Sequence, residues 1–580
     1  EIRLSLVGSE MCIRDSERIA VLHTTDYCSF DVENAEKIII KRNNRTYLEY
    51  IVNGKKQDVP EAAKCPPEPK DCKTNEDLYL YGLHIEQYRH ATYLAEDYYS
   101  EGLKRDDTDI RLNNAYGKLL LKRGLFKESE KHFRKAVEKA IRSNPNPYDS
   151  EPYYNLGLSL LYQNRLEESY DAFYKSTWSN ACQESAFYHL ACIAMRNGEA
   201  DLALEHIENA VIKNAHNIKA LDLKALILES QGLENDAQEL AKSVLKIDPL
   251  DVISKHILGE GPVISFNTAI EIAIEYANSG FINKAVKTLE GDTSNYPLIQ
   301  YYLCYYHHLL GNENKAKAYQ NLAQNVDFVG CFPHRMEDLI VLEYIVSSYE
   351  KDFAARYYLG CLLYDKKRYD DAINQWESSI SIYNKFPTVH RNLALAFYNK
   401  KHDADKAEKE LETAFALDTT DARVLMELDQ LYKKNGKSAD TRLSMLNKHI
   451  DLVVFRDDLL TEYITLLNTV GEYEKAFDMT MSHKFHPWEG GEGKITAQYA
   501  FSLTVMAKAE IESGNSDKAI ELLKKTAEYP HNLGEGKLYG AQENLQNYLL
   551  GVAYEKLGEA EQAEKYFEKA AAGLLSLIHI

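Results

Sequence analysis

The sequence predicts an all-α fold, a solenoid of about 12–13 stacked helical hairpins preceded by a short stretch of β structure. Small residues recur every 34 positions, as Gly157, Ala191 and Ala225 do, and Ala203 and Ala237 keep the same interval. A composition that is 45% hydrophobic, with only 14 prolines in 580 residues, indicates an ordered chain. Because one such hairpin cannot bury its own apolar face, consecutive copies must stack on each other.

Both ends of the chain are predicted to lie outside the fold. Residues 1–16, which contain SLVGSEMCIRDS, and residues 574–580, LLSLIHI, resemble translated sequencing-adapter read-through and do not continue the neighbouring patterns. On this interpretation the natural start is missing, so no targeting signal can be identified. Nine scattered cysteines without a CxxC pair indicate a reducing compartment, and we expect a cytoplasmic protein.

Residues 17–60 have a sequence pattern typical of β structure. Lys37–Arg42 and Tyr47–Ile51 read as two strands joined by a short turn at Asn43-Asn44. Two strands are not stable alone in water, so we interpret this region as the remnant of a larger β domain. Residues 61–75, with Cys65-Pro66-Pro67-Glu68-Pro69, are predicted to be a stiff linker rather than a zinc site.

Residues 76–573 are predicted to form the helical hairpins. Each unit places a small residue where its two helices approach, and a large apolar residue fills the remaining gap. Ile110–Ser143 fits this pattern with Gly117 and Phe133, whereas Asp421–Arg456 fits it worst. The 34-residue period and this pattern resemble tetratricopeptide repeats. That resemblance implies a right-handed superhelix that binds proteins or peptides.

Charge and motifs exclude several classes of function. The formal net charge of -21 and a pI near 5.4 argue against a nucleic-acid partner, and no apolar run is long enough to span a membrane. No nucleophile elbow, phosphate-binding loop or dinucleotide fingerprint is present. We therefore predict no catalytic residue, no metal and no cofactor, and we do not expect this fragment to be an enzyme.

Three insertions interrupt the repeat period. Gly471, Gly514 and Gly558 occupy the same turn position at spacings of 43 and 44, so two successive gaps carry extra residues. They contain similar sequences, which we name the first insert (residues 485–494) and the second insert (residues 529–544). A third insert, Asn144–Asp149, occupies the equivalent joint of an earlier unit. Insertions at matched joints fall on one edge of a solenoid, so the first two inserts are predicted to be neighbours.

Two interpretations of the first two inserts remain open. Glu492 and Glu535 lie between glycines just before helices, so they are predicted to cap those helix starts. Alternatively, the inserts form a ligand site with Trp488 as its stacking floor. The candidate ligand-binding residues are Trp488, Glu489, Glu492, Lys494, Gln498, Glu535, Lys537 and Gln542.

A second polar cluster lies on the first predicted helix. Its members, candidates for an interdomain or ligand contact, are His84, Glu86, Tyr88, Arg89 and His90. Glu86 and His90 are expected one helical turn apart. The spacing of His84, Glu86 and His90 does not match the HExxH arrangement of a metal site. A polar network joining the solenoid to the lost β domain and a ligand contact both remain open.

Many of the 41 tyrosines occur in pairs, such as Tyr153-Tyr154 and Tyr301-Tyr302. Aromatic residues at helical spacing usually pack in the core, although tyrosine also suits peptide binding and sugar stacking. The basic clamp that some tetratricopeptide domains use for chaperone tails is not predicted. Its positions hold Tyr154 and Leu158 in one unit and Tyr188 and Cys192 in the next.

Four segments together resemble one uncharacterised bacterial family. They are GLHIEQYRHAT (Gly82–Thr92), NPNPYDSEPYYNLG (Asn144–Gly157), FHPWEGGEGK (Phe485–Lys494) and YPHNLGEGKLYGAQEN (Tyr529–Asn544). The resemblance implies an N-terminal β-sandwich domain of unknown function, grouped with galactose-mutarotase-like folds, followed by tetratricopeptide repeats. This chain lacks nearly all of such a domain.

The sequence therefore favours a non-catalytic scaffold for protein–protein interaction. Its partner is predicted to be a protein or peptide, or its own missing β domain. The alternative is the helical half of a carbohydrate-binding or carbohydrate-active protein, because a pair of glutamates beside a tryptophan suits sugar recognition. The mutarotase-like grouping supports carbohydrate only by analogy of fold.

Overall fold

The protein is described by a computed structural model that divides into two units, Glu1–Lys73 and Thr74–Ile580. The described residues are 2–8, 17–20, 35–42, 45–51, 61–62, 64–88, 90, 92–324 and 330–572. Residues 574–580, predicted to be foreign to the fold, lie outside them.

The first unit contains a four-stranded antiparallel sheet in the order β2-β1-β3-β4. Its described strands are β1 (Ile2–Gly8), β2 (Glu17–Ala20), β3 (Ala35–Arg42) and β4 (Arg45–Ile51). The two predicted strands correspond to β3 and β4, which pair with Ile38 opposite Tyr50. β1 lies within residues 1–16, where we predicted no element. The assignment of residues 1–16 as foreign and 17–60 as a domain remnant stays a prediction.

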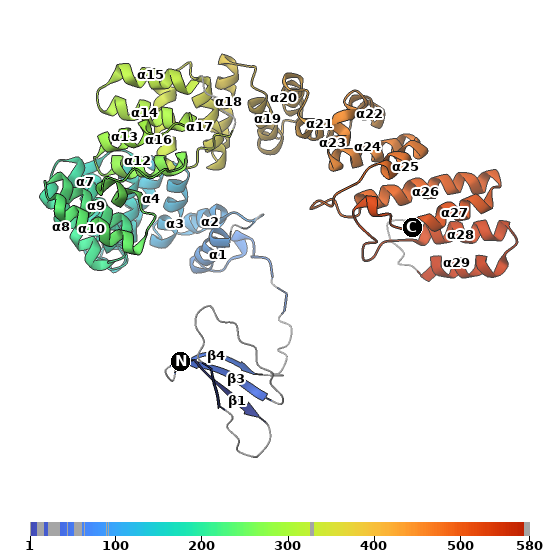
Figure 1. Cartoon of the computed structure of the whole chain (residues 1–580), viewed down its shortest axis with the longest axis horizontal. Coiled ribbons are helices and arrows are strands. Elements are labelled where there is room, and N and C mark those ends of the chain that lie inside the picture. The colour runs from blue at the N-terminus through green and yellow to red at the C-terminus, as the bar shows by residue number, and fades with distance from the viewer. Residues whose placement is uncertain are drawn as a thin grey trace. The chain divides into compact units, whose positions relative to one another are not determined.

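The second unit is helical throughout its described residues, which confirms the predicted all-α solenoid (Figure 1). Within the part of this unit that the structure describes, thirteen pairs of helices follow one another. The first seven pairs are α1 (Asn75–Tyr88) with α2 (Ala95–Arg105), α3 (Ile110–Lys122) with α4 (Phe126–Ile141), α5 (Glu151–Tyr162) with α6 (Leu166–Ser176), α7 (Gln183–Arg196) with α8 (Ala200–Lys213), α9 (Ile218–Ser230) with α10 (Glu234–Ile247), α12 (Phe266–Asn278) with α13 (Ile282–Glu290), and α14 (Pro297–Leu309) with α15 (Glu313–Gln324).

The remaining six pairs are α17 (Phe353–Asp365) with α18 (Tyr369–Ile382), α19 (Pro387–Ala396) with α20 (Ala404–Leu417), α21 (Ala422–Lys434) with α22 (Ala439–Asn447), α24 (Asp457–Val470) with α25 (Tyr473–Ser482), α26 (Lys494–Ser513) with α27 (Ser516–Lys525), and α28 (Asn544–Lys556) with α29 (Ala560–Ala572). Three helices stand between pairs: α11 (Val252–Ile257), α16 (Met336–Ser348) and α23 (Ile450–Phe455). Short helical segments are η1 (Pro69–Asp71), η2 (Phe397–Lys401) and η3 (His531–Leu533).

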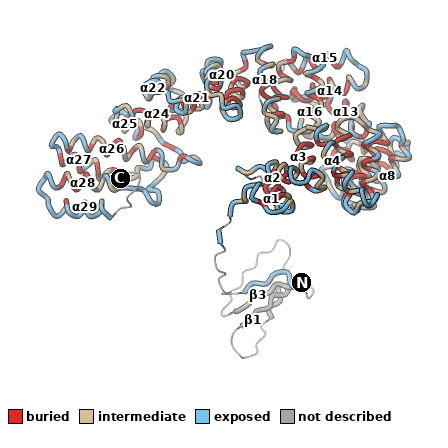
Figure 2. Tube along the Cα trace, turned by 180° about the vertical axis from the view of Figure 1, so that it is seen from behind, coloured by how far each residue is buried: buried red, intermediate tan, exposed pale blue. Residues whose placement is uncertain are grey.

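The small residue of each repeat allows its two helices to touch. A Cβ atom added to Gly117 would lie 2.6 Å from the ring of Phe133, and one added to Gly157 would lie 2.7 Å from Phe173. Both rings are fully buried. The close approach that the sequence pattern predicts is therefore confirmed, and buried residues recur along the paired helices (Figure 2).

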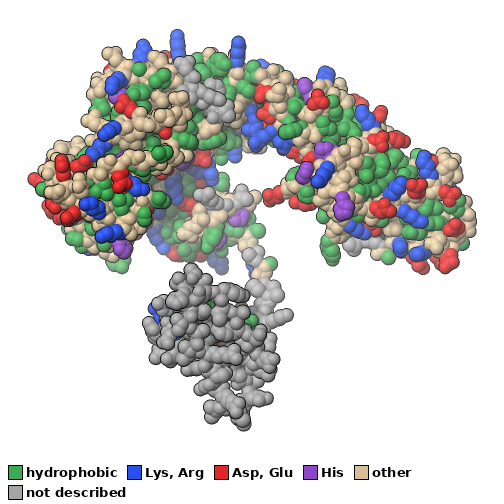
Figure 3. Space-filling model, in the orientation of Figure 1, with side chains coloured by type: hydrophobic (Ala, Val, Ile, Leu, Met, Phe, Trp, Pro, Cys, Tyr) green, Lys and Arg blue, Asp and Glu red, His purple; other side chains and the backbone are tan. Residues whose placement is uncertain are grey.

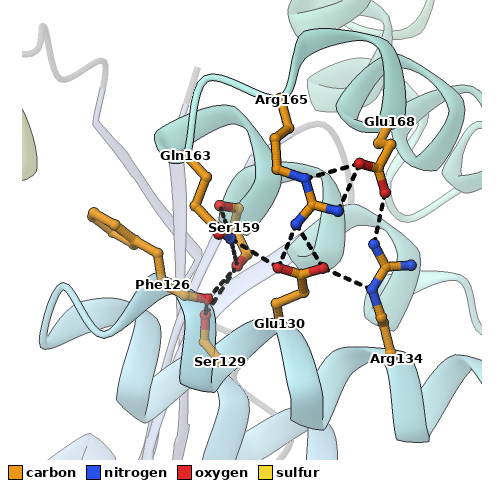
Figure 4. A network of polar contacts seen from close by, with 8 residues as sticks. All are labelled: Phe126, Ser129, Glu130, Arg134, Ser159, Gln163, Arg165 and Glu168. Carbon is orange, nitrogen blue, oxygen red and sulfur yellow. Dashed lines mark hydrogen bonds and ion pairs between the residues drawn. The ribbon is translucent and has the colours of Figure 1, made fainter.

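Neighbouring hairpins are also tied together by charged side chains at their edge. Glu130 of α4 accepts hydrogen bonds from Arg134 and Arg165, each at 2.7 Å, and Glu168 of α6 accepts from the same two arginines at 2.8 Å (Figure 4). Hydrogen bonds from Arg165 and then Arg134 hold the pKa of Glu168 below its ordinary value. The ring of four charges joins two consecutive repeats.

The tyrosine pair in α14 has the packing role that we expected, and its hydroxyls add a second role. Tyr301 and Tyr302 are buried. The Tyr301 hydroxyl donates to Asp352 at 2.9 Å and the Tyr302 hydroxyl donates to Asp338 at 2.7 Å. Both aspartates accept backbone amides at the starts of α17 and α16. Each tyrosine thus fixes the start of a later helix.

The poorest predicted repeat, Asp421–Arg456, departs from the pattern in the structure as well. It contains α21, the short α22 and the six-residue α23. Where other repeats have a small residue on the first helix, α21 has the fully buried Asp429. The Arg442 guanidinium of α22 donates to its carboxylate at 2.9 and 2.5 Å. An ion pair replaces the apolar contact at this position.

The solenoid also packs against itself beyond adjacent repeats. Leu339 of α16 lies against Gly124, in the turn between α3 and α4, and would be 2.2 Å from a Cβ atom there. Cys192 of α7 contacts the Ser279 hydroxyl at 3.5 Å, and Lys219 pairs with Glu275 of α12 at 2.8 Å. Cys192 is buried at this contact, at 5% exposure, and Asp222 of α9 is buried at 2% exposure beside Ser254 of α11. Part of the surface that first helices usually present to partners is therefore core here.

Candidate functional site

A pocket of about 320 Å³ opens between the first helices of three consecutive repeats, α1, α3 and α5. It combines charged side chains of both signs with the rings of two tyrosines. Its lining residues are Tyr79, Leu83, Glu86, Gln87, Tyr99, Ile110, Arg111, Asn114, Ala115, Lys118, Lys122, Asp149, Glu151 and Pro152.

The wall formed by α3 and α5 is held by a closed hydrogen-bond network. Asn114 and Lys118 lie one turn apart on α3, and both reach Glu151 in the first turn of α5, at 3.0 and 2.8 Å. Asn155 donates its side-chain amide to Asn114 at 2.9 Å. Asp149, from the third insert, accepts the Glu151 backbone amide at 2.9 Å. These contacts fix Glu151 and leave Asp149 at the exposed edge.

The wall formed by α1 includes one of the predicted residues. Glu86 accepts from the Tyr99 hydroxyl at 3.3 Å and forms an ion pair with Lys122 of α3. Arg111 forms an ion pair with Glu76 and lies over the face of Tyr79, 5.0 Å from the ring centroid. The contacts of Glu86 and Arg111 therefore join the first repeat to the second.

The other members of the predicted cluster do not share this pocket. His84 and Tyr88 are exposed, with ring centroids 4.6 Å apart. The expectation that His90 lies one helical turn from Glu86 is wrong, because α1 ends at Tyr88. The His90 Nδ1 instead accepts the backbone amides of Thr92 and Tyr93, both at 3.2 Å, in the turn before α2. Arg89 lies outside the described residues.

Carboxylates shift the pKa values of several groups in and behind the pocket. Burial opposes the charged form of Lys118, yet Glu151 and Glu86 raise its pKa above the ordinary value. The pKa of Arg111 is raised, first by its hydrogen bond to Glu76. Burial and then the charge of Glu86 raise the pKa of Tyr99. The pKa of Cys182 behind this wall is raised by burial and then by Glu151 and Asp149.

Sequence reasoning missed most of this pocket. It compared the clamp positions only in the two units that contain Tyr154 and Tyr188. The equivalent positions of the preceding unit, Ile110–Ser143, hold Asn114 and Lys118. Applying the same register one repeat earlier is the signal that would have found them.

The first and second inserts contact each other, as their matched positions predict. The Phe485 amide donates to the Asn532 carbonyl at 2.7 Å, and Gly534 lies directly against the Phe485 backbone. The Asn532 side-chain amide donates to the carbonyls of Thr480 and His483, at 2.8 and 3.0 Å. The second insert is thereby fastened to the end of α25.

Glu535 caps a helix, but not the helix that follows it. Its two carboxylate oxygens accept the Gly493 backbone amide at 2.9 and 3.0 Å, at the start of α26 in the preceding hairpin. The Thr496 hydroxyl is 3.4 Å from the same carboxylate. Glu492 is exposed. The two glutamates therefore differ in environment. Glu535 is engaged in a structural contact, so it is not free to act in the glutamate pair that the carbohydrate interpretation requires.

The other candidate ligand-binding residues of the first and second inserts either form structural contacts or are exposed to solvent. Trp488 packs over Gly491, whose Cβ would lie 2.0 Å from the ring. Gln498 accepts from Asn468 at 3.0 Å, Lys537 pairs with Glu543 at 2.6 Å, and Gln542 donates to a carbonyl at 3.2 Å. Glu489 and Lys494 are exposed. A ligand-binding role for these residues stays a prediction.

Removing the Glu535 carboxylate is expected to loosen the start of α26. The E535A substitution leaves the Gly493 backbone amide, just before the first residue of α26, without its acceptor and should cost about 1 kcal/mol of local stability. Hydrogen exchange of the first turn of α26 should become several-fold faster. The matched control E492A, at an exposed position, should leave this exchange unchanged. Equal exchange in both variants would contradict the capping role.

The described residues contain no cluster of three or more side chains suited to hold a metal ion. Among the same residues, no helix combines the length and apolar character needed to cross a lipid bilayer.

Two segments match known family models. Residues 360–401 match the model described as TPR repeat, and residues 547–572 match the model described as tetratricopeptide repeat. The helical unit therefore contains tetratricopeptide repeats, as the 34-residue period predicts.

Three solved structures are similar to parts of this chain. YrrB, described as a TPR protein with an unusual peptide-binding site, is 14% identical; the match covers 40% of this chain and 95% of YrrB, with a TM-score of 0.24. MamA is 21% identical over 33% of this chain and 100% of its own, with a TM-score of 0.26. PilF from Pseudomonas aeruginosa is 14% identical over 43% and 89%, with a TM-score of 0.27. Likenesses at this level carry no information on a site or ligand of this chain.

Proposed function

We propose that the protein is a non-catalytic interaction scaffold that holds an extended segment of a partner protein in the pocket between α1, α3 and α5. The observation that carries this proposal is the pocket itself, which spans the first helices of three consecutive repeats. Solenoids of this kind usually bind along such a row of helices. Further along the row, Cys192 of α7 and Asp222 of α9 are buried by the chain itself, whereas the pocket between α1, α3 and α5 is open.

The same proposal includes the resemblance to the bacterial family with a mutarotase-like β-sandwich domain. The four quoted motifs support it, because they fall on α1, on the third insert and on the first and second inserts. Within such a protein the helical unit would supply the binding surface, whatever chemistry the β domain carries.

A substitution that fills the pocket tests this function. Peptides are first selected from a random-sequence displayed library with the full chain. Gln87 is exposed and lines the pocket, so Q87W should fill it without disturbing the core. We expect Q87W to weaken the selected peptides by at least about tenfold, which corresponds to 1.4 kcal/mol.

The matched control is Q238W, at an exposed position of α10 outside the pocket. It should bind the peptides as the unchanged protein does. Circular dichroism of both variants checks that the helices are retained. Peptides that bind Q87W with undiminished affinity would place the binding surface elsewhere and overturn the proposal.

A further inference from the structure

The charged side chains that line the pocket are equal in number but are not all paired with one another. Among the described residues, three carboxylates, Glu86, Asp149 and Glu151, line it with three cationic side chains. The cations are Arg111, Lys118 and Lys122. Each of these cations already has a carboxylate partner within the fold: Glu76, Glu151 and Glu86 respectively.

Asp149 is the carboxylate left over. Among the described residues it forms no ion pair, and one of its oxygens accepts the Glu151 amide. It is exposed, and it belongs to the third insert, where the repeat period is broken. The insert therefore adds a negative charge at the edge of a pocket whose other charges are matched.

The titration of the surrounding groups agrees with this charge count. Lys118 and Arg111 hold their protons more firmly than usual, while Tyr99 and Cys182 resist becoming anions. Burial acts on all four groups and is the largest cause of the raised pKa of Tyr99 and of Cys182, while the pKa values of Lys118 and Arg111 are raised by carboxylates that include their own ion-pair partners. Carboxylates contribute to each shift, which is consistent with an unpaired carboxylate at the mouth of the pocket.

We infer that the partner segment is basic, and that it places a lysine or arginine side chain beside Asp149 at the mouth of the pocket between α1, α3 and α5. This inference rests on the proposed function and specifies the chemistry of its partner. The Tyr79 ring already receives the Arg111 guanidinium on its face, so the mouth offers aromatic as well as carboxylate contacts to a cation.

The negative net charge of the whole chain also favours a basic partner segment. At a formal net charge of -21, the protein attracts basic segments and repels acidic ones over several ångströms at moderate salt. On the face shown in Figure 3, acidic and basic side chains are interspersed over the helical unit. The general attraction is therefore diffuse, and a local excess such as that at Asp149 is needed for specificity.

Three labelled peptides of equal length test the inference by fluorescence anisotropy with the full chain. One carries lysines and arginines, one carries glutamates and one is uncharged, on otherwise identical sequences. We expect the basic peptide to bind at least about tenfold more tightly than the uncharged one at low salt. The acidic peptide should bind most weakly. The preference should shrink as salt is raised, because exposed charges are screened.

D149N isolates the local charge. Asparagine keeps the side-chain oxygen that accepts the Glu151 amide, so the loop is preserved while the charge is removed. We expect D149N to weaken the basic peptide about three- to tenfold more than it weakens the uncharged peptide. D517N, at an exposed position of α27, changes the net charge equally and should have no such effect.

The outcomes separate this inference from the function on which it rests. Equal or tighter binding of the acidic or uncharged peptide, or equal effects of D149N and D517N, overturns the basic partner. The scaffold function survives that result if Q87W still weakens binding by at least about tenfold. Binding that is insensitive to Q87W overturns both.

Discussion

Raising the pH from about 5 to 8 is expected to destabilise the repeats around α9, and D222N is expected to remove most of that loss. Asp222 is 2% exposed, and its carboxyl accepts from the Ser254 hydroxyl at 3.1 Å. Burial, and then the charge of Asp251, raises its pKa from an ordinary 3.8 to about 8. The carboxyl is therefore protonated in the folded protein at neutral pH and ionised in the unfolded chain.

The sign of the effect follows from proton linkage. Because the folded pKa lies above the unfolded value, the stability that Asp222 contributes is complete below about pH 4 and is lost as the pH rises towards 8. Each unit of pKa difference is worth about 1.4 kcal/mol, so the loss amounts to a few kcal/mol. Glu275, Tyr188 and Tyr276 also face this group. The charge of Glu275 opposes a second anion beside Asp251, whereas the two tyrosines are neutral in this pH range.

Hydrogen exchange of α9 and α11 at several pH values measures this prediction, since it reports local opening in a large repeat protein. D222N carries no charge at any pH and should flatten the pH dependence. D236N, at an exposed position of α10, should keep the slope of the unchanged protein. Parallel pH profiles for D222N and the unchanged protein would refute the conclusion that the Asp222 carboxyl is neutral in the folded protein.

The R442A substitution is expected to destabilise the α21–α22 repeat by about 3–5 kcal/mol. Arg442 is buried against Asp429, whose side chain is fully buried, and it also reaches Glu462 at 3.2 Å. Burial raises the pKa of Asp429 above its ordinary value even with Arg442 beside it. Removing the guanidinium would leave a buried carboxylate without its compensating charge, which is more costly than losing the pair as a whole.

A double variant distinguishes these two costs. D429A combined with R442M removes both charges and keeps an apolar side chain of similar length, so it should be considerably more stable than R442A alone. K508A breaks an exposed pair, Lys508 with Glu512, and should change stability by less than about 1 kcal/mol. Urea unfolding and hydrogen exchange of α21 and α22 provide the measurement. A double variant no more stable than R442A would contradict this account.

Local pattern determined the repeat architecture. Gly117 with Phe133 and Gly157 with Phe173 are recognisable in the sequence because contact within a hairpin depends on residues at fixed short spacing. The neighbouring position of the first and second inserts was predictable for the same reason, since stacking places equal joints of adjacent repeats together. The sequence predicted that Glu535 caps a helix but not which helix, because the helix that it caps belongs to another repeat.

The contacts that define the binding surface depend on how distant repeats meet. The sequence by itself determined a tetratricopeptide solenoid with a β segment before it, through spacings that act within one or two repeats. Only the tertiary structure decided that Asp222 and Cys192 are buried, that Asp429 is matched by Arg442, and that the open pocket lies between α1, α3 and α5. The physical reason is that burial and charge compensation are properties of surroundings assembled from several helices. No periodicity along the chain records which of those helices will come together.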